Sequence, residues 1–206
     1  MPTRFIFVRH AKSIAHDKDI VQGQGLLFPL GEEGRDCAVR LAEALKDYKF
    51  KKIFSSTSVR AIQTTQIVAE FHPNTPIEQI AELNERSKGA AEGLSREEFN
   101  KQYGYVLNEW SAGIDSKPEG WESMEDLHKR VMPVFEKHTK NIMSDNDENF
   151  LYVTHGNVIR TFLGNILQIP FPLRGRIAQD YCAITIASYS SEKMRWTIEC
   201  INKGLF

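Results

Sequence analysis

The sequence lacks long hydrophobic runs and an excess of charge of one sign. No stretch of its 206 residues approaches the roughly 20 apolar residues that a bilayer-spanning helix requires. The apolar run near the N-terminus ends at Val8, which is too short for the core of a signal peptide. With 26 Lys and Arg against 27 Asp and Glu, the net charge of -1 gives no overall field that would attract nucleic acid or an anionic membrane. We therefore expect no membrane-spanning segment and no nucleic-acid partner.

Cysteine is also scarce. The three cysteines, Cys37, Cys182 and Cys200, form neither a CxxC pair nor an even-numbered disulfide framework. Free thiols of this kind are typical of proteins in a reducing compartment, so we expect a cytoplasmic protein. Cys182 and Cys200 fall in two β-rich runs where they would face each other as thiols, and we assign no cysteine a catalytic role.

Short apolar runs are present instead, and several lead into a helical pattern. Residues 5–8, 52–55 and 150–154 are β-rich, as is typical of strands that are covered on both faces in a parallel sheet. Strands that alternate with helices form the βαβ pattern of a doubly wound α/β sheet. Two further runs, residues 181–189 and 195–201, predict an antiparallel hairpin at the edge of that sheet.

Three segments carry apolar residues at helical spacing. Residues 34–48 and 157–167 each have an apolar stripe on one face, which predicts helices packed against the sheet. Residues 122–143 predict a longer helix, in which Pro133 should produce a kink or remove one backbone hydrogen bond.

The pattern changes over residues 87–122. Ser95 and Glu98 have the spacing of a capping box, and aromatic and apolar residues then recur at helical spacing. We expect a helix inserted as a lid over the sheet, with its aromatic side chains in a packed face. Residues 1–206 would then form one domain with an insertion at about 87–122.

Two histidines occupy equivalent places. The segments FIFVRHA and FLYVTHG each deliver a histidine, His10 and His155, to the end of a strand. Ligands of open α/β sheets bind beyond the carboxyl ends of the strands, so the two histidines can meet in one crevice. Arg9 precedes His10, and Arg60 lies near the start of a helix that follows another strand. A metal site is the alternative, but the chain has no HxH, HExxH or clustered carboxylate spacing.

Such a set of groups suits a phosphoryl group. Arginine carries a permanent charge and binds phosphate oxygens in a fork, which neutralises them without a metal. A neutral histidine is a nucleophile near pH 7 and divides hydrolysis into two steps through a phosphohistidine. His155, if cationic, would add charge stabilisation. We therefore expect no metal and no other cofactor.

Four motifs carry a resemblance to a known family. VRHAKS, SSTSVRAIQTTQIVAE, LNERSKGAAEGL and VTHGNVIR occur in this order, and they resemble the histidine phosphatase superfamily, also called the phosphoglycerate-mutase-like family. The resemblance implies a three-layer α/β/α sandwich with a mostly parallel central sheet. It implies that His10 is the phosphorylated residue and that Glu85 donates a proton to the leaving group. The rest of the phosphate pocket would be formed by Arg9, Arg60 and His155.

The match has two departures from the family pattern. Ala11 stands where the family usually has glycine, and its Cβ is tolerable if the backbone keeps a negative φ. His16 stands where many members have asparagine; both can donate to a phosphate oxygen, but His16 would do so in a pH-dependent way. Ser13, Gly156 and Arg86 are further candidates for binding phosphate or substrate.

Three functions are open at this point. The first is a phosphatase that hydrolyses phosphomonoesters of small metabolites or phosphoproteins through His10. The second is a 2,3-bisphosphoglycerate-dependent phosphoglycerate mutase, whose branch carries an arginine pair after a tryptophan. Here Trp110 is followed by Ser111 and Ala112, and residues 87–122 hold four basic against seven acidic side chains, a net charge of -3. The third is a pseudoenzyme that binds a phosphorylated protein, although the nucleophile and the clamping arginines are all present.

Overall fold

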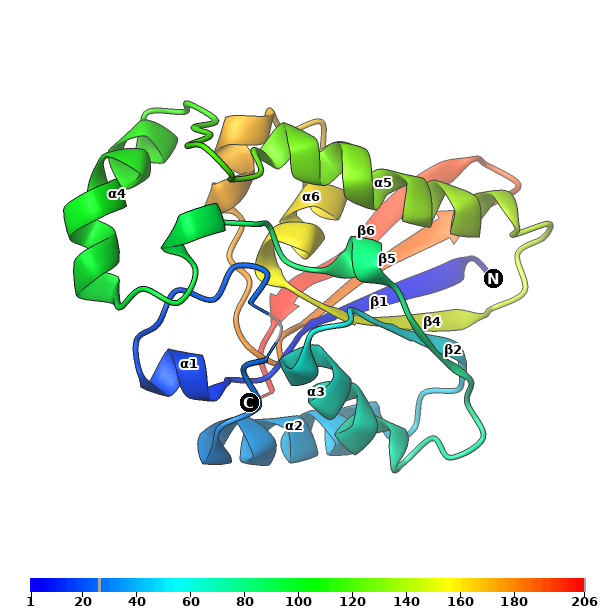
Figure 1. Ribbon diagram of the computed structural model, residues 1–206. Coiled ribbons are helices and arrows are strands. Elements are labelled where there is room, and N and C mark those ends of the chain that lie inside the picture. Colours follow the sequence, from blue (N-terminus) through cyan, green and yellow to red (C-terminus); the bar gives the residue numbers. More distant parts are fainter. Residues whose placement is uncertain (26, 206) are drawn as a thin grey trace.

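The central feature of the computed structural model, which describes residues 1–25 and 27–205, is a six-stranded sheet (Figure 1). The strands have the order β3-β2-β4-β1-β5-β6. Their bounds are Thr3–Arg9 for β1, Phe50–Ser55 for β2, Ile77–Gln79 for β3, Asn149–Thr154 for β4, Ile184–Ser190 for β5 and Arg195–Lys203 for β6. The first four strands pair in parallel, whereas β5 is antiparallel to β1 and β6 to β5. The mostly parallel sheet and the antiparallel edge hairpin are confirmed.

Helices cover both faces of this sheet. α2 (Glu32–Leu45) and α3 (Val59–Ala69) pack on one face, and α5 (Met124–Lys140) and α6 (Gly156–Ile166) pack on the other (Figure 1). α5 runs through Pro133, which has no amide hydrogen for the helical bond. The remaining elements are α1 (Ile14–Asp17), η1 (Ala81–Leu83), η2 (Gly89–Ala91), α4 (Arg96–Ser111) and η3 (Phe171–Arg176). The three-layer α/β/α arrangement is therefore confirmed.

The β1 strand shows why the sheet is buried on both sides. Successive side chains of a strand point to opposite faces. Ile6 and Val8 join the apolar cluster under α2 and α3, whereas Phe5 and Phe7 join the cluster under α5 and α6. All four are fully buried, and the ring of Phe7 lies 4.4 Å from that of Phe162 in α6, measured between centroids. The run is apolar without interruption because helices bury the side chains on both faces of the strand.

α4 lies outside the two helical layers, at one end of the molecule (Figure 1). Its capping box is present as predicted: Ser95 Oγ accepts from the amide of Glu98, and the Glu98 side chain accepts from the amide of Ser95. The aromatic face of the helix is packed in a third apolar cluster. Its buried members are Val21, Ala91, Phe99, Val106 and Trp121.

The expected approach of Cys182 and Cys200 across the hairpin is wrong. Cys200 pairs with Ile186 in the β5–β6 ladder, and Cys182 precedes the first residue of β5. Its backbone has a φ of 58°, which turns the chain before the strand begins. Cys182 packs in the cluster that Cys37 borders, and all three cysteines are free. Among the helices of the described chain, none combines the length and apolar character that crossing a bilayer requires.

Candidate active site

Three neighbouring parallel strands end at the same edge of the sheet. β4 lies between β2 and β1, and Arg9 at the end of β1 pairs with Thr154 at the end of β4. The amide of His10 donates to the carbonyl of Thr154 at 2.9 Å. His155 follows Thr154 and is the N-cap residue of α6, while α3 carries Arg60 just beyond the end of β2. The four residues predicted to form a phosphate pocket therefore meet.

His10 has a defined tautomer. Its Nδ1 lies 2.8 Å from the carbonyl oxygen of Ala11, which can only accept, so Nδ1 carries the hydrogen. Nε2 is then unprotonated, and it accepts from Nε of Arg60 at 3.2 Å. Burial, followed by the charges of Arg60 and Arg9, holds the pKa of His10 well below its ordinary value of 6.5. His10 is therefore a neutral imidazole whose Nε2 lone pair accepts from the guanidinium of Arg60.

His155 lies against His10, with 4.9 Å between the ring centroids. Nη2 of Arg60 lies 3.5 Å from its Nδ1, and Ser56 Oγ lies 2.8 Å from its Nε2. Because a guanidinium only donates, Nδ1 is the acceptor and Nε2 is the donor. Burial, then the charges of Arg60 and His10, lower the pKa of His155 well below 6.5. The structure thus favours a neutral His155 over the cationic form considered from the sequence.

The two arginines are held differently. Arg60 is only 1% exposed, and its terminal nitrogens donate to the carbonyls of Gly23 and Gly25. Burial lowers the pKa of Arg60 to about 10, so it remains charged at neutral pH. Arg9 donates to the carbonyl of Gln179 at 2.6 Å, and its guanidinium lies 3.7 Å from the ring centre of Tyr181. Nε of Arg9 is buried without a partner among the described residues, so this donor is available to an anion.

The N-terminus of α6 closes another side of the site. A Cβ on Gly156 would lie 3.7 Å from Nε of Arg9 and 3.4 Å from Nη1 of Arg160, so glycine leaves the space between these groups open. The amide of Asn157 lies 3.4 Å from Oε2 of Glu85, whose Oε1 accepts from the amide of Arg86 at 2.8 Å. Glu85 is therefore brought to the same place as the histidines, as the resemblance implied.

Several of these groups, His10 and Glu85 among them, line a cavity of about 200 Å³. Its charged wall, within the described residues, consists of five basic side chains and one carboxylate, those of Arg9, Arg60, Lys88, Arg96, Arg160 and Glu85. The cavity therefore suits a small anion whose oxygens accept from several cations at once. No group of three His, Cys, Asp or Glu side chains in the described part of the chain is placed to hold a metal ion.

Comparison with known proteins agrees with this geometry. The model of the histidine phosphatase superfamily (branch 1) matches residues 5–203. The chain belongs to the histidine phosphatase superfamily. It is 32% identical over 168 residues to a 2,3-bisphosphoglycerate-dependent phosphoglycerate mutase of Cytophaga hutchinsonii, a match that covers 80% of this chain and 77% of that protein.

Solved structures show the same fold. Bacillus stearothermophilus YhfR has a TM-score of 0.88 and 25% identity, with 98% of this chain and 97% of that chain covered. A mycobacterial glucosyl-3-phosphoglycerate phosphatase in complex with VO3 has a TM-score of 0.86 and 23% identity, with 98% and 99% covered. The structural relatives therefore include a phosphatase, whereas the curated sequence relative is named a mutase.

The chain has a second cavity beside the first, of about 530 Å³. The two share Lys88, Asn157 and Arg160 in their walls. Apolar side chains line part of the second cavity, namely those of Leu107, Trp110, Met124 and Pro172. Its basic side chains are those of Arg86, Lys88, Arg160 and Arg176.

The charges of the second cavity do not cancel. Asp115 is the carboxylate in its wall among the described residues. Its Oδ1 lies 3.9 Å from Nη1 of Arg86, and its two oxygens accept from the amides of Met124 and Glu125 at the start of α5. Arg86 is 3% exposed and lies 4.3 Å from the Trp110 ring, and its Nε has no partner in the part of the chain that is described. The cavity is therefore cationic, although the segment around it is acidic overall.

Four residues predicted to bind phosphate or substrate do not line the first cavity. His155 is fully buried and contacts His10 without lining the cavity. Ser13 is buried and donates to Oε1 of Gln22 at 2.8 Å, so it reaches the first cavity only through Gln22. His16 is exposed, and its ring packs 5.1 Å from that of Tyr181 without lining the cavity. Arg86 lines the second cavity and not the first.

Sequence reasoning missed several lining residues. Arg160 stands one helical turn after Gly156, so the i, i+4 spacing of α6 was a usable signal that both face the site. Lys88 lies two residues after Arg86 but was counted only as part of the lid. Tyr181 gave no signal, because it lies in an irregular segment between η3 and β5.

Proposed function

We propose that this chain is a phosphomonoesterase that forms a phosphohistidine on His10. The observation that supports this most directly is the orientation of His10. Its Nδ1–H donates to the carbonyl of Ala11, and the unprotonated Nε2 lies 3.2 Å from Arg60 at the wall of a cationic cavity. A neutral nucleophile beside fixed cations suits attack on a phosphorus atom whose oxygens those cations neutralise.

The reaction proceeds in two displacements. In the first, Nε2 of His10 bonds to phosphorus, the ester P–O bond breaks, and Glu85 gives its proton to the leaving oxygen. Arg9 and Arg60 hold the phosphoryl oxygens while the attacking and leaving atoms stay in line. In the second, Glu85 takes a proton from water as the water oxygen bonds to phosphorus and the P–N bond breaks. Phosphate leaves, and both His10 and the protonated Glu85 are restored.

The adjoining cavity is the proposed site of the leaving group. Its volume of about 530 Å³ falls in the range of small-ligand sites. It shares Lys88 and Arg160 with the phosphate cavity, so the two cavities adjoin and a single substrate can extend from one into the other. We therefore propose a phosphorylated metabolite as substrate, with a phosphoprotein side chain as the alternative.

A bisphosphoglycerate-dependent mutase is the second candidate. Two observations favour it: the mutase name of the Cytophaga relative and the cationic second cavity. The net charge of residues 87–122 argued against a mutase, but several of these carboxylates are engaged elsewhere. Glu92 and Glu122 accept from loop amides, and Asp115 accepts from amides of α5. Hydrolysis still ranks first because Ser111, in the cavity wall, stands where the mutase branch carries arginine.

We also propose a reducing, cytoplasmic location. The basis is that all three cysteines are free in this structure, although Cys37 packs against the apolar cluster that contains Cys182. A reducing compartment keeps such thiols unpaired.

Three assays test the proposed function. Purified protein should hydrolyse p-nitrophenyl phosphate in EDTA, and acid-labile phosphate should accumulate on wild type but not on His10→Ala. Conversion of 3-phosphoglycerate should stay slower than hydrolysis, with or without 2,3-bisphosphoglycerate. Faster mutase turnover would reverse the ranking, loss of activity on chelation would favour a metal mechanism, and phosphate binding without turnover would indicate a pseudoenzyme.

A further inference from the structure

The segment that carries Glu85 is held by side chains instead of a strand partner. The backbone carbonyls of residues 82–85 each accept a hydrogen bond from a side chain. Thr154 Oγ1 donates to the carbonyl of Leu83 at 2.7 Å, and Arg130 donates to the other three at 2.7, 3.1 and 3.2 Å. Buried backbone carbonyls that are not paired within a sheet or helix need such partners. One guanidinium therefore serves three of the four carbonyls, and the side chains of Asn84 and Leu83 add contacts with Thr57 and the apolar core.

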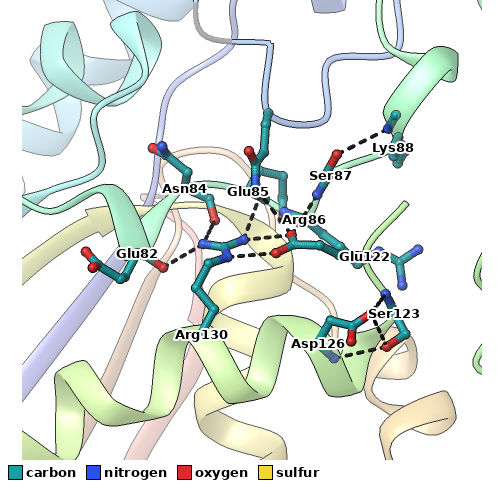
Figure 2. Close-up of polar contacts among 12 residues, drawn as sticks. Glu82, Asn84, Glu85, Arg86, Ser87, Lys88, Glu122, Ser123, Asp126 and Arg130 are labelled. Atoms are coloured by element: carbon teal, nitrogen blue, oxygen red, sulfur yellow. Dashed lines mark hydrogen bonds and ion pairs between the residues drawn. The ribbon is translucent and has the colours of Figure 1, made fainter. Parts of the chain in front are cut away.

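Arg130 reaches the segment from α5 with every donor in use (Figure 2). Its Nε and Nη2 each donate to an oxygen of Glu122 at 2.8 Å, in a bidentate ion pair. Nη1 donates to the carbonyls of residues 82 and 84, and Nη2 donates to that of Glu85. A guanidinium has five N–H donors in a rigid fork, and this arrangement accounts for all five. Lysine has no such fork and cannot replace it.

Glu122 extends this clamp past Glu85. Its Oε2 accepts from the amide of Ser87 at 2.9 Å (Figure 2). The same oxygen accepts from Nε2 of Gln24 at 3.3 Å. The backbone is therefore fixed both before and after Glu85. Gln24 lies between Gly23 and Gly25, whose carbonyls accept from Arg60. The clamp thus connects the loop of the proposed acid with the loop that contacts the phosphate-binding arginine.

The side chain of Glu85 has little support of its own. Within the described residues, its carboxylate accepts only from two backbone amides, those of Arg86 at 2.8 Å and Asn157 at 3.4 Å. Where the carboxylate lies is then decided by the backbone that carries it. A displacement of about 1 Å can cost roughly a hundredfold in rate, so the backbone clamp bears directly on proton transfer.

We propose that Arg130, paired with Glu122, is a positioning residue for proton transfer by Glu85. Arg130 does not line the phosphate cavity, so it acts through Glu85 and not by touching the substrate. The inference rests on the proposed function, in which Glu85 protonates the leaving oxygen. It predicts a defect that depends on the leaving group, which a general loss of structure would not produce.

The test compares kcat/KM on two substrates. p-Nitrophenyl phosphate releases a stable phenolate without a proton, whereas glycerol 2-phosphate releases an alkoxide that needs one. Arg130→Lys should lower kcat/KM about a hundredfold on glycerol 2-phosphate and change it little on p-nitrophenyl phosphate. Glu85→Gln removes the proposed acid itself, so the difference between its kcat/KM losses on the two substrates is the largest that Arg130→Lys can show. The parameter kcat/KM is used because it excludes dephosphorylation of His10, where Glu85 acts again.

Two further variants serve as controls. Arg4→Lys alters another ion-paired arginine, which contacts the carboxylates of Asp147 and Glu199 at the opposite end of β1. It should change neither substrate's kcat/KM. Glu122→Gln keeps the size of the side chain but replaces one accepting oxygen with a donating amide, which breaks one of the two bonds from Arg130. It should show the same selectivity if Arg130→Lys does not fold. Circular dichroism checks folding of each variant.

Equal losses on both substrates in Arg130→Lys and Glu122→Gln, with Glu85→Gln still selective, would make the clamp purely structural and overturn the inference. An unselective Glu85→Gln would also overturn it, because there would be no acid to position. The proposed function is judged separately, since phosphate labelling of His10 does not depend on which leaving group is used.

Discussion

Nε of Arg60 donates a hydrogen bond to Nε2 of His10 at 3.2 Å. One contact therefore joins the proposed nucleophile to a group that would bind the phosphate it attacks. The positive charge of Arg60 also disfavours the imidazolium form of His10. It is the second cause of the lowered pKa of His10, after burial. Arg60 therefore contributes both to the orientation of the nucleophile and to its neutral form, together with the Ala11 carbonyl and burial.

The first prediction concerns the titration of His10 in the free protein. Because burial and two arginines lower its pKa, His10 should remain neutral well below pH 6.5 and become protonated only in more acidic solution. Arg60→Met removes one cation, so it should move this titration upward, toward 6.5. NMR titration of the ring hydrogens measures both, with His10→Ala for assignment. Protonation of wild-type His10 above pH 6.5 would contradict the prediction.

Replacement of Arg60 should impair catalysis more than its charge alone suggests. Arg60→Lys keeps a cation but loses the donors to His10 and to the carbonyls of Gly23 and Gly25. We expect kcat/KM on p-nitrophenyl phosphate to fall about 10²- to 10³-fold. Arg35→Lys, on the exposed side of α2, should retain full activity. A loss of less than about tenfold for Arg60→Lys would argue against a clamping role.

Lys88 should make the binding of substrates that carry a carboxylate besides the phosphate depend on pH. Burial, followed by the charge of Arg86, lowers the pKa of Lys88 to about 8, so its ammonium charge is present at pH 7 and lost as the pH rises past 8. The KM for 3-phosphoglycerate should rise about tenfold between pH 7 and 9, as expected for one lost charge-assisted hydrogen bond.

Two controls accompany this measurement. The KM for glycerol 3-phosphate, which has no carboxylate, should change much less over the same range. Lys88→Arg keeps its charge at pH 9 and should flatten the rise. A rise of equal size in Lys88→Arg would assign the effect to another group.

His16 and Tyr181 should differ although their rings are in contact. His16→Asn should change kcat/KM by no more than about twofold, because the side chain is exposed and outside the cavity. Tyr181→Ala should lower it substantially, since the guanidinium of Arg9 lies on the Tyr181 ring at 3.7 Å. Tyr181→Phe keeps the ring and should recover most of the activity. A large effect of His16→Asn would restore His16 to the site.

Two glycines should respond in opposite ways to alanine. A Cβ on Gly34 in α2 would lie 1.8 Å from the backbone oxygen of Lys12, so Gly34→Ala should destabilise the protein by about 1–3 kcal/mol. Gly104 in α4 has no atom within 4 Å of its Cβ position among the described residues, so Gly104→Ala should stabilise by about 0.5–1 kcal/mol. Urea denaturation measures both, and a neutral Gly34→Ala would show that α2 can shift.

Site residues could be predicted from the sequence where a histidine or arginine follows directly after a predicted strand. His10 and His155 could be placed together because each follows an apolar run, and open sheets gather such ends at one edge. Arg60 followed from its position just after a third run. Glu85 came only from the resemblance, since several carboxylates lie close to it and no periodicity distinguishes it.

Other parts of the site could not be predicted because they depend on tertiary contacts. The net charge of residues 87–122 did not reveal a cationic cavity, since it does not show which carboxylates bind backbone amides. β3 was missed because its three residues are exposed and form no apolar run. The partnership of Arg130 with residues 82–85 needs the packing of α5 on the sheet.

The place of β4 between β1 and β2 bears on how the chain matures. The two strands made early in synthesis, which precede the nucleophile and Arg60, do not pair with each other; they are joined by a strand that emerges only with residues 149–154. A nascent chain shorter than this has both N-terminal motifs but no sheet to align them. Phosphate-binding capacity should consequently arise late on the ribosome, in a single step rather than by gradual accumulation.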